Sequence, residues 1–267
     1  MFEIFKSFLP ASKPAPRAAR VPPGQRVYAV GDIHGRIDLF APLAEALDAD
    51  DAARAPAETT FILLGDLVDR GPDSAGVVAL ARAWQQRRDV RILAGNHEEM
   101  FLLGFTNLDV LRHFLRHGGR ETLLSYGLDR ARYNAASIEE VQAMMEAAVP
   151  EADRAFIAGF EDKIAIGDYL FVHAGIDPAV PIEEQKTSDL RWIREPFLSH
   201  EEPHGPVVVH GHTIAGDPVE TGNRIGIDTG AYASGRLTAL VLEGAERRFI
   251  AAVSDDSGQV RIEHTQT

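Results

Sequence analysis

The sequence predicts an α/β fold, with most of the chain in one large domain. Three short apolar, β-branched runs each end in Gly-Asp or Gly-Asn, and segments with helical spacing follow them. A long middle stretch then shows helical spacing only, and strand-like runs return after it. At 267 residues, with 45% hydrophobic and 25% charged residues, the chain can bury a large core.

The first hundred residues contain the three strand-to-loop units. The strands are expected at Val27 to Val30, Phe61 to Leu64 and Val90 to Ala94, and the helices at Leu39 to Leu47 and Ser74 to Gln86. The loops after the strands begin with Gly31-Asp32, Gly65-Asp66 and Gly95-Asn96. Since open α/β sheets build their sites just past the carboxyl ends of buried strands, polar side chains in these loops are candidate site residues.

The middle of the chain, about residues 98–160, is expected to be a helical insert beside the site, with a break at Gly118-Gly119. Strand-like runs resume at Tyr169 to Val172, Val207 to Val209, Arg224 to Ile227, Leu237 to Leu242 and Phe249 to Val253. Because few helices separate these runs, we expect a mostly antiparallel sheet there.

The chain is predicted to have two parts. Residues 1–25 form a flexible N-terminal tail, and residues 26–267 form a catalytic domain. Residues 1–10 contain an apolar cluster but are too short for a membrane span, and they lack a signal-peptide cleavage pattern, so a cytoplasmic protein is expected. A frayed tail is the first interpretation of residues 1–10, and a helical docking peptide or peripheral membrane anchor is the alternative. Residues 11–23 contain four prolines among basic residues, a composition typical of an extended linker.

The net charge argues against nucleic acid as a partner, and the absence of cysteine excludes thiolate ligands for a metal. Forty acidic residues against 27 basic ones give a net charge of −13, which repels phosphate backbones and makes nucleic acid a poor partner. The chain has no cysteine, so a metal would bind histidine, carboxylate, amide or water ligands.

Nine polar side chains follow five of the predicted strands, and six of them are candidate metal ligands. Hard divalent ions accept such ligands, and two ions about 3.5–4 Å apart need one ligand that bridges them, which a single aspartate can supply. Any one of these residues alone is more often a turn residue or a satisfied polar group, so the prediction rests on their recurrence at intervals of about 30 residues, one strand-helix unit. The residues are Asp32, His34, Asp66, Asp69, Arg70, Asn96, His97, His173 and His212.

Three motifs in order resemble those of the phosphoprotein phosphatase branch of the calcineurin-like metallophosphoesterases, which includes the eukaryotic serine/threonine phosphatases and the bacteriophage lambda phosphatase. They are Gly31-Asp32-Ile33-His34-Gly35, Gly65-Asp66-Leu67-Val68-Asp69-Arg70-Gly71 and Gly95-Asn96-His97-Glu98, followed by Val172-His173-Ala174-Gly175 and Gly211-His212-Thr213. The resemblance covers about residues 27–242. It implies a central mixed β-sandwich flanked by helices.

The resemblance also implies a metal centre and a reaction. Asp32, His34 and Asp66 would bind a first divalent ion, and Asp66, Asn96, His173 and His212 a second. Manganese is the first expectation, and iron or zinc would also suit these ligands. A hydroxide shared by the ions would attack a phosphate monoester in line, most simply phosphoserine or phosphothreonine in a phosphoprotein or phosphopeptide, with phosphotyrosine also open.

Other residues receive roles from chemistry and resemblance together. Arg70 is expected to hold phosphate oxygens, with Asn96 beside it, and Arg194 of Trp192-Ile193-Arg194 is the second phosphate arginine. Arg191 is the alternative, and either arginine could instead form a surface ion pair.

His97, held by Asp69, is expected to protonate the leaving group, although the pair could instead only orient its loop. His210 lies two residues before His212 and is expected on the same strand face, as support. Asp228 is expected to shape the floor of the site. Glu98 and Glu99 are expected to be solvated or capping charges.

Two rival functions stay open. The first is an enzyme of the same fold with another substrate, a symmetrical dinucleoside tetraphosphate hydrolase or a phosphodiesterase. Asp69 and Glu98 favour the protein phosphatases over that branch. The second is a non-catalytic binding scaffold, which the complete ligand set argues against.

Overall fold

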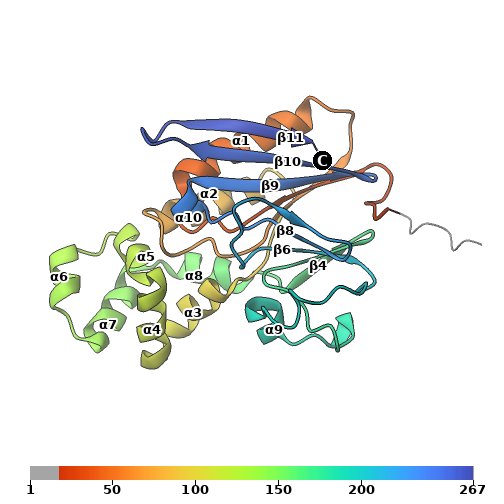
Figure 1. The fold of residues 1–267 in the computed structure, drawn as a ribbon. Helices are drawn as coiled ribbons and strands as arrows, with labels where there is room; N and C mark the ends of the chain where they lie inside the picture. Colours follow the sequence, from red (N-terminus) through yellow and green to blue (C-terminus); the bar gives the residue numbers. More distant parts are fainter. Residues whose placement is uncertain (1–17, 267) are drawn as a thin grey trace, which may run out of the picture.

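Two mixed β-sheets form the centre of the computed structural model, which describes residues 18–266 (Figure 1). The first sheet has the order β11-β10-β9-β1-β2-β3. Its strands are β1 (Gln25–Val30), β2 (Glu58–Leu63), β3 (Val90–Ile92), β9 (Arg236–Glu243), β10 (Glu246–Ser254) and β11 (Val260–Gln266). The second sheet has the order β4-β5-β6-β8-β7, with β4 (Lys163–Ile166), β5 (Tyr169–Val172), β6 (Val207–His210), β7 (Val219–Glu220) and β8 (Arg224–Gly226).

The sheets pack face to face, because strand β1 is apolar on both sides. Val27 and Ala29 of β1 lie in one buried cluster with Phe171 and Val209 of the second sheet. Tyr28 and Val30 point the other way, into a cluster with the helices α1 (Ile37–Ala52) and α2 (Ser74–Gln85). A strand buried on both faces reads as a continuous apolar run, as the sequence of β1 does. The predicted β-sandwich flanked by helices is confirmed.

The prediction of a mostly antiparallel second half is wrong for the second sheet. Strand β5 pairs parallel with β6, and β6 pairs parallel with β8. The second sheet is antiparallel only in its outer pairs, β4 with β5 and β7 with β8. In the first sheet, β9, β10 and β11 pair antiparallel, and β9 also pairs antiparallel with β1. The connections between β5, β6 and β8 carry loops and the short helix α9 (Thr187–Trp192), so the crossovers left little helical signal in the sequence. The parallel strands end at one edge, with β1 to β3, and there the site forms.

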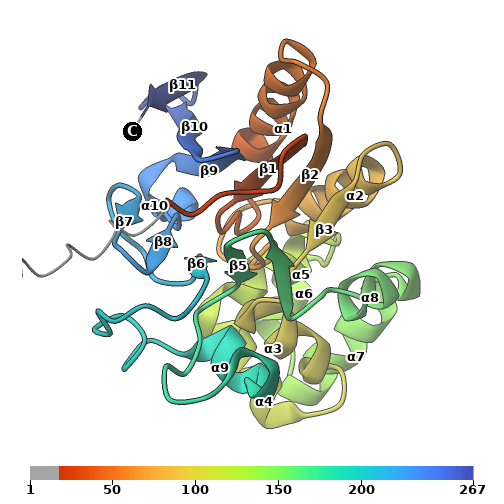
Figure 2. The same cartoon turned by 90° about the vertical axis from the view of Figure 1, so that its right-hand side faces the viewer.

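The helical insert is present and has a core of its own. It consists of α3 (Asn96–Gly104), α4 (Leu108–Phe114), a π-helical segment (Leu115–Gly119), α5 (Arg120–Ser125), α6 (Arg130–Ala135), α7 (Ile138–Ala148) and α8 (Glu151–Ala158). Phe101, Phe114 and Met145 are buried in its core together with Val68, which follows β2. The expected break occurs at Gly118, whose φ is 110°. Figures 1 and 2 both place these helices below the first sheet, near α9.

The start of the described chain is packed against the sheets. Val21 is fully buried, and its N–H donates to the carbonyl of Gly244 at 3.0 Å. The predicted boundary between tail and domain at residue 25 therefore falls inside packed chain. The tail interpretation of residues 1–17 lies outside the described residues. Among residues 18–266, no helix has the length and apolar character to span a membrane.

Candidate metal centre

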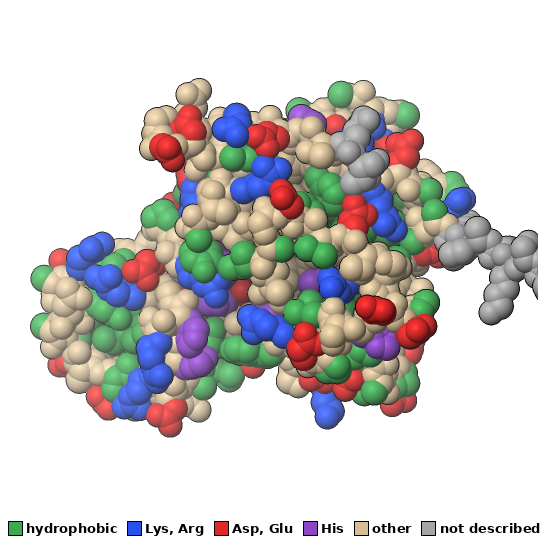
Figure 3. Space-filling view, in the orientation of Figure 1, with side chains coloured by type: hydrophobic (Ala, Val, Ile, Leu, Met, Phe, Trp, Pro, Cys, Tyr) green, Lys and Arg blue, Asp and Glu red, His purple; other side chains and the backbone are tan. Residues whose placement is uncertain are grey.

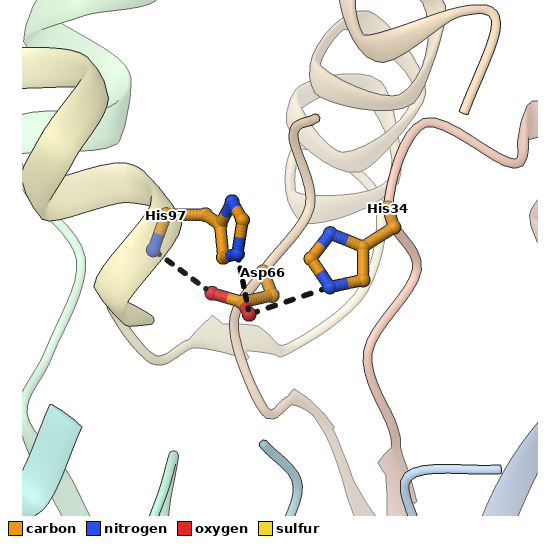
Figure 4. Close-up of side chains that lie close together, drawn as sticks. All are labelled: His34, Asp66 and His97. Atoms are coloured by element: carbon orange, nitrogen blue, oxygen red, sulfur yellow. Dashed lines mark hydrogen bonds and ion pairs between the residues drawn. The ribbon is translucent and has the colours of Figure 1, made fainter. Parts of the chain in front are cut away.

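The loops that follow the parallel strands bring the predicted metal ligands together. Asp66 lies at the middle, and Figure 4 shows it between the side chains of His34 and His97. Its Oδ2 lies 3.4 Å from His34 Nε2 and 3.9 Å from His97 Nε2. Its Oδ1 lies 3.4 Å from His173 Nε2. Asp66 thus has the geometry of a ligand shared between two ions.

The second group is completed by Asn96 and His212. Asn96 Oδ1 lies 3.1 Å from His173 Nε2 and 2.9 Å from His212 Nδ1. Asp66, His173 and His212 form one group of potential ligand atoms within 4.8 Å of one another, and His34, Asp66 and His97 form another. Atoms bound at right angles to an ion at about 2.1 Å lie about 3 Å apart, so these spacings fit a divalent cation.

The hydrogen bonds of the histidines also fit cation binding. His34 Nδ1 lies 2.8 Å from the carbonyl of Val68, and His173 Nδ1 lies 2.8 Å from that of Leu64. Since a carbonyl only accepts, each Nδ1 carries the hydrogen and each Nε2 turns a lone pair towards Asp66. Lone pairs and carboxylate oxygens therefore converge on the same space, where a cation would bind them.

Asp32, the remaining predicted ligand, lies at the edge of these two groups. Its carboxylate accepts the N–H of His212 at 3.0 Å, and it is not part of either group within 4.8 Å. Burial, with the nearby charges of Asp228 and Asp66, raises the pKa of Asp32 well above its ordinary value. Its role as a ligand of the first ion stays a prediction.

Burial disfavours charge throughout the centre. It raises the pKa of Asp66 to about 6 and lowers the pKa values of His173 to about 3 and of His212 to about 2. Neutral histidines and buried carboxylates are the forms that bind cations, and bound cations would supply the missing positive charge.

Strained backbone is concentrated at this centre. Within residues 18–266, positive φ angles at non-glycine positions occur at five residues, and all five were predicted site residues. They are His34 (47°), Asp66 (51°), Asp69 (75°), Arg70 (69°) and His212 (62°). Such conformations cost about 1–3 kcal/mol each and persist where the surroundings over-determine them.

His97, a member of the first group, is held by a carboxylate. His97 Nδ1 lies 2.6 Å from Asp69 Oδ2, and both side chains are buried. The Nε2 atom of His97 faces Arg70, whose Nη2 is 2.9 Å away. The other guanidinium nitrogen of Arg70, Nη1, lies 2.8 Å from His34 Nε2, and the guanidinium lies 4.7 Å from the centre of the Tyr232 ring.

The two candidate arginines near α9 have different surroundings. Arg191 forms ion pairs with Asp162 at 2.7 Å and with Glu99 at 3.1 Å. Arg194 is exposed and has no ion pair with any residue in the described range. Its charge adds to burial in lowering the pKa of His212, so it lies near the centre. Arg194 is therefore the arginine that is available to a substrate.

Of the expectations about neighbouring residues, the capping alternative for Glu98 is confirmed and the shared strand face of His210 is wrong. Glu98 is buried rather than solvated, and its carboxylate accepts the N–H groups of Asp66, Leu67 and Gly95 at 2.8, 2.8 and 2.9 Å. It caps α3, as the alternative held, and it also anchors the loop that carries Asp66.

His210 does not share a face with His212, because β6 ends at His210 and the backbone of His212 is left-handed. Its ring packs on Phe197, at 5.1 Å between ring centres. Asp228 lies beside Asp32, and its Oδ1 accepts the N–H of Gly230 at 2.9 Å. Sequence reasoning did not find Thr122 or Tyr232, because neither lies in a motif.

The surface around the centre differs from the acidic average of the chain. In Figure 3, histidine and basic side chains gather across the middle of the face, between the helical insert and the part of the chain around α9. This concentration of positive charge suits an anionic substrate.

Two curated relatives match most of the chain. The bis(5'-nucleosyl)-tetraphosphatase PrpE (asymmetrical) of Bacillus mycoides is 25% identical over 233 residues, which are 79% of this chain and 88% of the relative. The protein of the same name from Bacillus velezensis is 26% identical over 259 residues, which are 88% and 96% of the two chains.

Two solved structures share the fold. The crystal structure of a candidate diadenosine tetraphosphatase has a TM-score of 0.60 and 21% identity, covering 94% of this chain and 100% of that one. The cold-active protein-tyrosine phosphatase of a psychrophilic Shewanella has a TM-score of 0.54 and 18% identity, covering 92% and 83%. The family model for calcineurin-like phosphoesterases matches residues 25–234, and the chain belongs to this family.

Proposed function

We propose that the protein is a phosphatase that uses two divalent ions and removes phosphate from phosphoserine and phosphothreonine in proteins or peptides. The observation that carries this proposal is the buried pair of His97 and Asp69, with the Nε2 atom of His97 turned towards Arg70 and Asp66. The ligands proposed for the ions are Asp32, His34, Asp66, Asn96, His173 and His212, with manganese the first choice. Asp69 and Glu98 support the phosphoprotein phosphatase branch of the family.

The bound ions and the side chains of the protein would have different tasks in this reaction. When bound, two divalent ions would lower the pKa of a water molecule and neutralise phosphate oxygens. Arg70 would donate N–H groups to the phosphate, and Arg194, exposed nearby, would hold a second side of it. Glu98 holds the loop of Asp66 by its backbone, so the shared carboxylate keeps its orientation.

The chemistry of the leaving group explains why the reaction needs an acid. A serine alkoxide is a strong base and leaves readily only when it receives a proton. Asp69 holds Nδ1–H on one side of the ring, while Nε2 accepts an N–H from Arg70 in this structure. To act as the acid, His97 would carry a second proton on Nε2, which would then point to the leaving oxygen in place of Arg70. A nucleotide phosphate, with a pKa of about 6, leaves without this help. The pair therefore favours substrates with alcohol leaving groups.

A second candidate is asymmetrical hydrolysis of dinucleoside tetraphosphates. Its support is the activity for which the PrpE relatives are named; the relative from Bacillus mycoides matches 79% of this chain at 25% identity. The symmetrical cleavage that the sequence suggested as an alternative has no such support.

The test compares substrates with the purified protein and manganese. Phosphoserine, phosphothreonine and phosphotyrosine peptides and diadenosine tetraphosphate are compared by kcat/KM, and the nucleotide products are identified. We expect the phosphoserine and phosphothreonine peptides to be preferred. A preference for the dinucleotide above about tenfold, about 1.4 kcal/mol of transition-state discrimination, would overturn the proposal. Products AMP and ATP would then establish the asymmetrical reaction.

A further inference from the structure

The acid pair is held from the helical insert. Thr122, on α5, is fully buried, and its hydroxyl donates to Asp69 Oδ1 at 2.6 Å. The same hydroxyl oxygen accepts the N–H of Asp69 at 2.8 Å, and it lies 2.9 Å from Ser74 Oγ. Thr122 therefore binds both the backbone and the side chain of the residue that holds His97.

The hydrogens of this network have one consistent arrangement. The N–H of Asp69 can only donate and its carboxylate can only accept, so the single hydrogen of the Thr122 hydroxyl points to Asp69 Oδ1. The Ser74 hydroxyl must then donate to Thr122, while Ser74 Oγ also accepts the N–H of Asp69 at 3.0 Å. Oδ1 of Asp69 is thus occupied by Thr122, and Oδ2 is left for His97 Nδ1, at 2.6 Å.

The insert also provides a hydrogen-bond acceptor for the backbone N–H of the next residue, Arg70. Asp69 and Arg70 are consecutive left-handed residues, a strained arrangement that needs outside support. The N–H of Arg70 donates to the carbonyl of Gly118 at 3.1 Å, in the π-helical segment of the insert. Because a buried N–H without a partner is costly, the insert stabilises the loop in the conformation that the centre needs.

We propose that Thr122 is a positioning residue for the reaction: it holds Asp69 so that His97 presents Nε2 to the leaving oxygen. This inference rests on the acid role proposed for His97. It assigns the helical insert a part in the chemistry, through one hydroxyl, in addition to any part in substrate binding.

The experiment measures how the rate depends on the leaving group. Full-length protein with saturating manganese is assayed on aryl phosphates whose phenols have pKa values from about 7 to about 10. His97→Asn removes the acid, so kcat should fall most for the poorest leaving group, by about 100-fold or more. Thr122→Val should follow the same trend with a fall of about 10-fold to 100-fold for that substrate, little change for the best leaving group and an unchanged KM. Thr122→Ser, which keeps the hydroxyl, should restore the rates.

Three controls separate positioning from a general loss of structure. Thr59→Val removes a similar bond, from Thr59 Oγ1 to Asp51 Oδ1 at 2.7 Å, at the far end of β2 and should leave all rates unchanged. The double variant of Thr122→Val and His97→Asn should be no slower than His97→Asn alone, because Thr122 acts through His97. Ser74→Ala gives a weaker effect of the same kind and replaces Thr122→Val if that variant does not fold.

A further measurement does not depend on turnover. In chelator-treated protein, the Nδ1 proton of His97 should give a downfield NMR signal in the wild type and in Thr122→Ser, and the signal should be shifted or lost in Thr122→Val.

Two outcomes would overturn the inference. Equal losses on all leaving groups in Thr122→Val, additive with His97→Asn, would show a merely structural role. A leaving-group dependence that stays flat in His97→Asn would remove the acid role itself, and the role of Thr122 with it. A dependence that appears in His97→Asn but not in Thr122→Val would refute the inference and leave the proposed function standing.

Discussion

At the scale of single residues, the centre holds its buried polar groups in the orientations and protonation states that bind cations. Asp66 turns its two carboxylate oxygens to two different groups of ligands, and its N–H is held by Glu98 at 2.8 Å. Neighbouring histidines are held as neutral groups because burial lowers their pKa values. The carboxylate of Asp66, whose loop Glu98 holds, and the neutral imidazoles around it form a preorganised cation site, which needs little rearrangement when ions bind.

His210 shows the same effect outside the centre and gives a prediction on pH. Burial lowers its pKa to about 4, below its ordinary value of 6.5. The folded state therefore favours the neutral ring, and this contribution to stability is full above pH 6.5 and is lost as the pH falls towards 4. In chelator-treated protein, the stability advantage of wild type over His210→Asn should shrink by roughly 1–3 kcal/mol from pH 7 to pH 4, measured by urea unfolding. A difference that is constant with pH would contradict this.

At the scale of elements, the Gly118 turn is one of the places where the helical insert contacts the centre. Gly118 has a φ of 110°, and a Cβ added there would lie 2.6 Å from the backbone nitrogen of Arg70. Only glycine combines this backbone conformation with so close an approach. The glycine break visible in the sequence is therefore a point at which the insert contacts the loop of Asp69 and Arg70.

A pair of glycine variants tests this junction. Gly118→Ala should displace Arg70 and lower kcat/KM about 10-fold to 100-fold, since misplacement of a catalytic group by about 1 Å can cost 100-fold. Gly127→Ala is the matched control: Gly127 lies in the same insert with a φ of 86°, but no atom lies within 4 Å of its added Cβ. Both variants should lose about 1 kcal/mol or more of stability from backbone strain. Only Gly118→Ala should lose activity in a steady-state assay, and equal activities would refute the junction.

At the scale of the whole molecule, ligands from both sheets meet at one edge of the sandwich. Asp32 and Asp66 follow strands of the first sheet, and His173 and His212 follow strands of the second. Ions bound there would join the two sheets and stabilise the native state, because the unfolded chain lacks the assembled site.

Metal removal should therefore change stability as well as activity. Adding manganese to chelator-treated protein at about 100 times its dissociation constant should raise the free energy of unfolding by about 2.7 kcal/mol and the melting temperature by several degrees. Asp66→Asn should reduce this shift and the phosphatase activity together. Asp217→Asn, an exposed control, should leave both unchanged in a thermal scan. If manganese raised the melting temperature of Asp66→Asn as much as that of the wild type, the ions would bind at another site.

The start of the packed domain can be located by truncation. Removing residues 1–17 should leave the melting temperature and the activity on an aryl phosphate unchanged. Removing residues 1–24 should destabilise the protein by about 2 kcal/mol or more, because Val21 is fully buried and bonded to Gly244. Differential scanning calorimetry of both truncations measures this, and equal melting temperatures would refute the packed boundary.

The sequence by itself determined the α/β class, the helical insert and the order of the ligand loops, because strand alternation, helical spacing and glycine turns are signals carried by neighbouring residues. It also singled out the six predicted ligands, because all of them follow predicted strands. They are Asp32, His34, Asp66, Asn96, His173 and His212.

Only the tertiary structure decided that the strands divide between two sheets, that Glu98 is buried and that Arg191 rather than Arg194 is held in ion pairs. It also joined Thr122 to Asp69, 53 residues apart in sequence. These features arise where distant segments pack, and no local pattern of residues encodes which distant hydroxyl or carboxylate will meet a given backbone N–H.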